Sequence, residues 1–186
     1  LARQVRGLRL TGAVAVRPHE GVRPVWGHEG WQPDVLVLMA EECRDVEVDH
    51  CRVENVRTLV RTTFSENVSV HENRAEWCEG ISDFSTGSRN VRHYGNWSRN
   101  VVHQCMWWGG DGNDAHDWVT DYTSNVVRPD LRPGDEGYDP DTAGIYDVNV
   151  QNNYAEYGVT LSWGAKARNV VMMGNIAKYT EDMAYD

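Results

Sequence analysis

The stretch Asn67-Val-Ser-Val-His-Glu-Asn73 recurs along the chain in recognisable form. Close counterparts are Asp147-Val-Asn-Val-Gln-Asn-Asn153 and Asn169-Val-Val-Met-Met-Gly-Asn175. The opening Asx-Val pair is found at Asp45-Val46, Asn67-Val68, Asn90-Val91, Asn125-Val126, Asp147-Val148 and Asn169-Val170. The spacings between successive pairs are 22, 23, 35, 22 and 22. In four of the six repeats an Asn occupies the fifth position after the Val. A fixed period of this length predicts a repeat architecture.

Each repeat has the pattern of one coil that contains short strands. Val68 and Val70 alternate with polar residues, so one side of the strand is apolar. Asx before the strand and Asn after it suit turns, because Asn tolerates the left-handed conformation and bonds its own backbone. One coil cannot bury its apolar side alone, but parallel coils stacked about 4.8 Å apart can. Asn residues at equivalent corners are then expected to form a ladder of amide hydrogen bonds.

We therefore predict an all-β stacked solenoid with a period of about 22 per coil. The chain has 25 Val against 8 Leu and 3 Ile, a β-branched bias that also favours strands. An antiparallel sandwich with regular turns is the alternative, but it requires no constant period with Asn at a fixed offset.

The pattern resembles the right-handed parallel β-helix of the pectate-lyase-like superfamily over residues 45–186. It extends less directly to Val5-Arg-Gly-Leu-Arg-Leu-Thr-Gly12. The resemblance implies a right-handed parallel β-helix and is more specific for fold than for function. Because the sequence stops in the middle of a coil without a polar cap, we expect a fragment of a longer helix.

Two departures from the period predict insertion loops within a single domain spanning residues 1–186. Between Leu8 and Val46 there are about 16 extra residues, assigned to 17–33. Between Val91 and Val126 there are about 12 extra residues, assigned to 107–118. Insertions in a solenoid extend from one face, which is often the face that binds a ligand.

Composition excludes several classes of protein. The 18 Lys and Arg residues against 28 Asp and Glu residues give a net charge of −10, which argues against a nucleic-acid partner. The longest apolar run, Val35–Ala40, is far shorter than the roughly 20 residues of a membrane span. No CxxC pair is present, and Cys43, Cys51, Cys78 and Cys105 are expected to be mainly reduced and core-facing.

The segment 109–141 is rich in acids and glycine and is the first candidate for chemistry. Its opening, Gly109–Asp114, resembles the start of the calcium-binding nonapeptide of repeats-in-toxin proteins. Clustered carboxylates suit Ca²⁺, which takes six to eight oxygen ligands. The candidate Ca²⁺ ligands are Asp111, Asp114 and Asp141, and the alternative is a solvated loop.

The β-helix resemblance implies a polysaccharide lyase or a glycoside hydrolase. For a lyase, His116 is the candidate base and Arg128 or Arg132 the group that holds a uronate carboxylate. For a hydrolase, Asp117 and Asp139 are the candidate acid and base. Asp139 lies in Gly137-Tyr-Asp-Pro-Asp141, which looks like a stretch of alginate C5-epimerases but lacks their essential His.

Aromatic side chains are the candidate sugar-binding groups, because an apolar ring with a polar tip suits a pyranose. We assign this role to Trp107, Trp108, Trp118 and Tyr138, with internal aromatic stacking as the alternative. Trp107 and Trp108 are adjacent and should face opposite sides of a strand. His71 and His93 are predicted to occupy equivalent strands, as a surface stack or, alternatively, as a ladder with an acid–base role.

These patterns predict a carbohydrate-active β-helix protein, a lyase or hydrolase acting on an extended polysaccharide outside the cell or at its surface. The alternative is a non-enzymatic β-helix of the surface, adhesin, tailspike or filament type that binds glycans or partners. A third interpretation is a metal-binding structural module of a larger secreted protein. Self-association through the solenoid ends is expected in each case.

Overall fold

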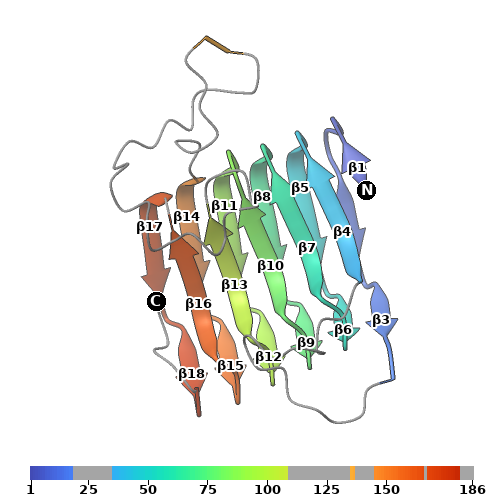
Figure 1. Cartoon of the computed structure of the whole chain (residues 1–186), viewed down its shortest axis with the longest axis vertical. Helices are drawn as coiled ribbons and strands as arrows, with labels where there is room; N and C mark the ends of the chain where they lie inside the picture. Colours follow the sequence, from blue (N-terminus) through green and yellow to red (C-terminus); the bar gives the residue numbers. More distant parts are fainter. Residues whose placement is uncertain (19–34, 109–134, 137–144, 166, 181–186) are drawn as a thin grey trace.

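The computed structural model describes residues 1–18, 35–108, 135–136, 145–165 and 167–180 of the chain. Within these ranges the regular structure consists of strands in three parallel sheets of six, and there is no helix. Figure 1 shows the strands of successive coils side by side, from the blue N-terminal coil to the red C-terminal one. The predicted all-β parallel solenoid is confirmed.

Each coil contributes one strand to each sheet, so that every strand pairs with the third strand after it in the chain. Sheet A contains β1 (Ala2–Arg3), β4 (Leu36–Glu41), β7 (Thr58–Thr63), β10 (Gly80–Ser85), β13 (His103–Trp108) and β16 (Thr160–Ala165). Sheet B contains β2 (Arg9–Thr11), β5 (Arg44–Asp49), β8 (Glu66–His71), β11 (Arg89–Tyr94), β14 (Ile145–Gln151) and β17 (Ala167–Met173). Sheet C contains β3 (Val14–Val16), β6 (Arg52–Glu54), β9 (Arg74–Glu76), β12 (Trp97–Arg99), β15 (Tyr154–Glu156) and β18 (Ile176–Lys178).

The repeated Val residues form the interior column of sheet B. Val46 pairs with Val68, Val68 with Val91, and Val91 with Val148. All four are at most 1% exposed. The alternation read from the sequence therefore places the apolar side of each strand in the core, as period-two geometry requires.

The predicted asparagine ladder is present at the corner between sheets B and C. Asn73, Asn96 and Asn153 are at most 2% exposed. The Asn73 backbone N–H donates to Asn96 Oδ1 at 3.0 Å, and that of Asn96 donates to Asn153 Oδ1 at 3.0 Å. The Nδ2 of Asn96 donates to the Val70 carbonyl at 2.9 Å, and that of Asn153 donates to the His93 carbonyl at 3.0 Å. Each of these side chains thus accepts from a backbone N–H and donates to a backbone carbonyl of the coil before it.

The Asx residues that open the repeats form a second, outer column. Asp45, Asn67 and Asn90 have φ of 56°, 54° and 50°, in the left-handed region that Asn and Asp tolerate best. The Asn67 amide donates to Asp45 Oδ1 at 2.9 Å, and the Asn90 amide donates to Asn67 Oδ1 at 2.8 Å. Asn and Asp at this position therefore both adopt the left-handed backbone conformation and form the hydrogen bonds between coils.

The first insertion has the length that the sequence predicts. Leu10 pairs with Val48 in the next coil, and the two positions differ by 48 − 10 = 38. An uninterrupted coil accounts for 22 of these positions, the separation of Asp45 from Asn67. The difference, 38 − 22 = 16, is the expected insertion.

The second insertion is longer than the sequence predicts. Val91 pairs directly with Val148, and the two positions differ by 148 − 91 = 57, which leaves 57 − 22 = 35 extra positions instead of 12. The predicted coil at Asn125-Val126 therefore does not lie between these strands, and that pair is outside the described residues. The boundary at 107 was also wrong, because Trp107 and Trp108 belong to β13.

The core contains a polar group that the sequence did not predict. His93 points inward, fully buried and paired with Val70, so His71 and His93 are not equivalent and form no surface stack. The Gln104 Nε2 donates to Ser98 Oγ at 2.8 Å, and Gln104 Oε1 lies 3.3 Å from His93 Nε2. The amide oxygen only accepts, so the proton is on Nε2, and Nδ1 accepts from the Ser82 hydroxyl 2.8 Å away.

The four cysteines are free and buried, as predicted. Burial raises the pKa of Cys78 and of Cys105 to about 12. Both thiols therefore stay protonated at neutral pH.

Replacing Asn96 with Ala should destabilise the solenoid strongly. The change leaves the Asn73 N–H and the Val70 carbonyl buried without partners. We expect a loss of roughly 3 kcal/mol in the free energy of unfolding, measured by urea denaturation. Asn149→Ala, at an outward-facing and half-buried position of β14, is the matched control and should change the free energy by about 0.5 kcal/mol or less. Equal losses for the two variants would contradict a structural role for the ladder.

His93 should make the fold sensitive to mild acid. Burial lowers the pKa of His93 to about 3, from an ordinary value of 6.5. Below pH 6.5 His93 is protonated in the unfolded chain but stays neutral in the folded chain. The free energy of unfolding therefore falls as pH drops from 6.5 toward 3. The slope from this group is at most about 1.4 kcal/mol per pH unit.

Urea unfolding of the protein and of His93→Gln between pH 7 and 5 measures this contribution. The variant should lose stability less steeply than the parent as pH falls, because the glutamine does not titrate. Identical slopes would contradict the assignment.

Candidate functional site

The outer side of sheet B carries a column of polar groups, one from each of four successive coils. Thr11 pairs with Asp49, Asp49 with His71, and His71 with Tyr94. Glu47 lies two residues before Asp49 and faces the same way, because successive side chains of a strand alternate. The stacking of coils therefore brings together residues that are far apart in the chain.

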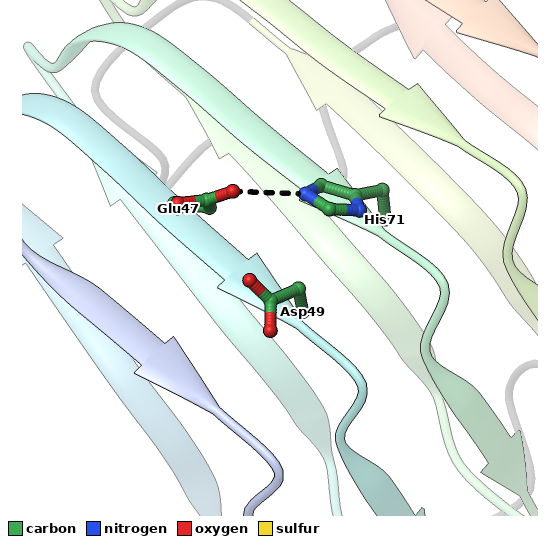
Figure 2. A group of neighbouring side chains, drawn as sticks. All are labelled: Glu47, Asp49 and His71. Carbon is green, nitrogen blue, oxygen red and sulfur yellow. Dashed lines mark hydrogen bonds and ion pairs between the residues drawn. The ribbon is translucent and has the colours of Figure 1, made fainter.

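Glu47, Asp49 and His71 form what we call the acid–histidine cluster. Figure 2 shows the two carboxylates on β5 and the imidazole on β8 turned toward one another. One ligand atom from each residue lies within 4.8 Å of the other two, and Glu47 Oε1 is 3.2 Å from His71 Nε2. The side chains of Asp49, His71 and Glu47 are 0%, 11% and 42% exposed, so the cluster is open on the Glu47 side.

His50 and Glu72 close the cluster from the corner that follows the strands. Both residues have φ of 53°. His50 Nδ1 lies 3.1 Å from Asp49 Oδ1, and His50 Nε2 lies 3.4 Å from Glu72 Oε2. The same Glu72 oxygen lies 3.2 Å from His71 Nδ1. Glu72 therefore orients both imidazole rings.

Arg9 and Thr11, from the first coil, hold Asp49 in its ionised form. The Arg9 guanidinium donates to Asp49 Oδ2 at 2.8 Å, and the Thr11 hydroxyl donates to Asp49 Oδ1. The hydrogen bond from Thr11, followed by those from His50 and Arg9, lowers the pKa of Asp49 well below its ordinary value, although burial opposes the shift. Arg9 Nε also lies 3.4 Å from Glu47 Oε2.

Tyr94 and Arg92 extend this outer face by one coil. The Tyr94 ring stacks on His71, with 4.6 Å between centroids and 6° between planes. Burial, with the negative charges of Glu72 and Glu47, raises the pKa of Tyr94. The phenol therefore keeps its proton at neutral pH and is a proton donor rather than a base. Arg92 points outward from the same strand and is exposed.

Most of the residues that the sequence singled out lie outside the described part of the chain. These are His116, Asp117, Arg128, Arg132 and Asp139, the Ca²⁺ candidates Asp111, Asp114 and Asp141, and the aromatics Trp118 and Tyr138. Their assigned roles stay predictions.

The adjacent tryptophans are placed on the last described strand before the second insertion. Trp107 is 3% exposed and belongs to the hydrophobic core, so its ring has little surface left for a sugar. Trp108 ends β13. The expectation that Trp107 offers a stacking face was therefore wrong, because its side chain packs over Gly164 of the next coil.

The sequence contains a signal for the acid–histidine cluster, but it lies in the coil spacing and not in a short motif. Asp49 and His71 are one coil apart in the sequence, and so are His71 and Tyr94. Residues at this spacing must be neighbours in a stacked solenoid. Applying the period of Val and Asn to the polar positions of the repeat would have grouped them.

Aromatic rings on sheet C and its corner are covered by cations. The Arg74 guanidinium lies 4.2 Å from the Trp97 ring centroid, and Lys178 Nζ lies 5.4 Å from that of Tyr154. Tyr157 has the Arg99 guanidinium 5.3 Å from its centroid and stacks on Tyr179 at 4.9 Å. These rings stabilise contacts between coils.

Comparison with family models, curated proteins and solved structures finds no match to this chain. No segment of the described ranges forms a helix with the length and apolar character that a membrane crossing requires. The arrangement of the residues is thus the basis for a functional proposal.

Gly164→Ala should destabilise the fold through Trp107. A Cβ at position 164 would lie 1.8 Å from Trp107 Nε1, so the ring must move. We expect a loss of about 1–3 kcal/mol in unfolding free energy. In a Trp107→Val background the same glycine change should have a much smaller effect, which a double-mutant cycle by urea unfolding measures. Additive effects would contradict this contact.

Proposed function

We propose that this chain is a carbohydrate-active β-helix protein that holds an extended polysaccharide against the outer face of sheet B. The observation that carries the proposal is the alignment of Arg92 and Tyr94 beside the acid–histidine cluster, on strands of successive coils. A polymer lying across the coils would meet a cation, a phenol and carboxylates in turn. The likeness of the repeat to pectate-lyase-like β-helices supports the same class.

Elimination from a uronate polymer is the reaction these groups suit best. Arg92 would hold the sugar carboxylate and favour the negative charge that develops when the neighbouring carbon loses its proton. The C–H electron pair forms the new double bond, the glycosidic C–O bond breaks, and Tyr94 gives its proton to the leaving oxygen. The base is the sequence candidate His116, with Arg128 or Arg132 as further carboxylate-binding groups.

Other parts of the proposal rest on the sequence alone. Hydrolysis by Asp117 and Asp139 is the alternative reaction, and Ca²⁺ at Asp111, Asp114 and Asp141 is the proposed cofactor. A polysaccharide substrate would place the protein outside the cell or at its surface. No step in the elimination described above depends on the Ca²⁺.

A non-enzymatic surface or filament protein is the second candidate, and the sheet C rings favour it. The faces of these rings are occupied by Arg74, Arg99 and Lys178. This is expected of a protein in which the rings stabilise the stacking of coils and do not bind a substrate. The last described coil also exposes Met173 and Ile176 on the outer sides of sheets B and C, by 60% and 51%. Such apolar groups would support contacts with a partner.

Assays on polygalacturonate, alginate and a glycosaminoglycan test the enzyme proposal. Unsaturated product is followed by ultraviolet absorbance, and new reducing ends report hydrolysis. Tyr94→Phe should lower kcat by about 100-fold, because the proton donor is lost. Arg92→Ala should raise KM for the uronate polymer and also lower kcat, because Arg92 both holds the carboxylate and stabilises the charge that develops on it.

Arg52→Ala is the matched control, since Arg52 is an exposed arginine on sheet C, and it should leave both constants unchanged. Absence of product on every glycan would contradict the enzyme. If the protein binds a glycan without converting it, and Arg92→Ala abolishes that binding, the non-enzymatic binding protein is supported instead.

A further inference from the structure

The acid–histidine cluster has the composition of a metal ligand set. His71 Nε2 and one oxygen each of Glu47 and Asp49 lie within 4.8 Å of one another, and the imidazole nitrogen and the Glu47 oxygen are 3.2 Å apart. One imidazole with two carboxylates suits borderline first-row cations such as Zn²⁺ and Mn²⁺. The ligands come from adjacent strands of one sheet, so coil stacking fixes their positions before any ion binds.

The imidazole contacts need either extra protons or a cation. Each nitrogen of His50 and of His71 lies 3.1–3.4 Å from a carboxylate oxygen. A neutral imidazole donates from one nitrogen only and presents a lone pair at the other. In each neutral ring, one nitrogen lone pair therefore faces a carboxylate oxygen. A cation between His71 Nε2 and Glu47 Oε1 would turn this repulsive contact into two ligand bonds.

The local charge also fits a divalent ion. Glu47, Asp49 and Glu72 carry three negative charges, and Arg9, the cation that contacts this group among the described residues, carries one positive charge. For these four side chains the sum is −3 + 1 = −2. A divalent cation neutralises it.

Groups around the ligands match the outer shell that metal sites use. With its proton on Nδ1, 3.2 Å from Glu72 Oε2, His71 would donate to Glu72 and keep the Nε2 lone pair for the metal, as in carboxylate–histidine–zinc arrangements. Arg9 and Thr11 hold the Asp49 carboxylate through Oδ2 and Oδ1, which fixes its position beside His71. The half-exposed Glu47 leaves a side open for water or a further ligand.

We propose that Glu47, Asp49 and His71 bind one divalent transition-metal cation, with Glu72 as the positioning residue for His71. This site differs in place and ligand chemistry from the Ca²⁺ site proposed at Asp111, Asp114 and Asp141. The proposed metal site does not depend on whether the protein acts on polysaccharides.

Isothermal titration of the chelator-treated protein with ZnCl₂ and MnCl₂ tests the site. We expect a Zn²⁺ binding event that Glu47→Gln and His71→Gln each weaken by 100-fold or more. Glu72→Gln should weaken it by roughly 10–100-fold, the range for outer-shell partners. Glu156→Gln, which removes the same charge from sheet C, is the matched control and should bind Zn²⁺ as the parent does.

Nitrogen NMR of His71 supplies a second readout that a folding defect would not imitate. Zn²⁺ should shift the Nε2 resonance and leave Nδ1 protonated. Three results would overturn the proposal: Zn²⁺ binding that is unchanged in folded His71→Gln, no binding at all, or an imidazole that keeps both protons in saturating Zn²⁺. The last result would show that protons, not a metal, resolve the lone-pair contacts.

Discussion

The asparagine ladder is the constraint on which the rest of the structure depends. At the corner between sheets B and C the backbone N–H groups of Asn73, Asn96 and Asn153 are bonded by side chains. An amide side chain in the next coil supplies the acceptor, and its Nδ2 donates to a carbonyl of the coil before, as Asn96 does to the Val70 carbonyl. A coil that slipped by one residue would lose both bonds and expose its valines, so a single register is stable.

That register also explains how a chain with scattered acids and histidines assembles one cluster. Arg9 and Asp49 are distant in the chain, yet the guanidinium reaches the carboxylate at 2.8 Å because their strands are neighbours. The same stacking sets His71 beside Glu47 and Tyr94 above His71. Because the strands are held by the ladder on one edge and by valines underneath, the outer side chains project from a rigid support.

The sequence predicted the fold better than the site, and the reason is physical. Val and Asn recur because every coil needs the same core and the same corner, so their period is visible in one sequence. Outward residues such as Glu47 and His71 have no such requirement, and only the coil spacing connects them. The coil predicted at Asn125-Val126 was wrong because a short Asx-Val pair can recur in a sequence without a coil: Val91 pairs directly with Val148.

The positions of the two insertions follow from the same constraint. One separates β3 of sheet C from β4 of sheet A, and the other separates β13 of sheet A from β14 of sheet B. Neither falls at the corner from sheet B to sheet C, where the ladder lies.

The second insertion leaves the ladder intact. Although it lies between Asn96 and Asn153 in the chain, the amides of these two residues are 3.2 Å apart, close to the 3.1 Å between those of Asn73 and Asn96, which no insertion separates. Long loops cost little closure entropy once the coils on either side are docked, whereas extra residues at the ladder corner would leave buried N–H groups without acceptors. Sequence variation in a solenoid of this kind should therefore concentrate at the two corners of sheet A, which leaves the B–C corner and the support for the acid–histidine cluster intact.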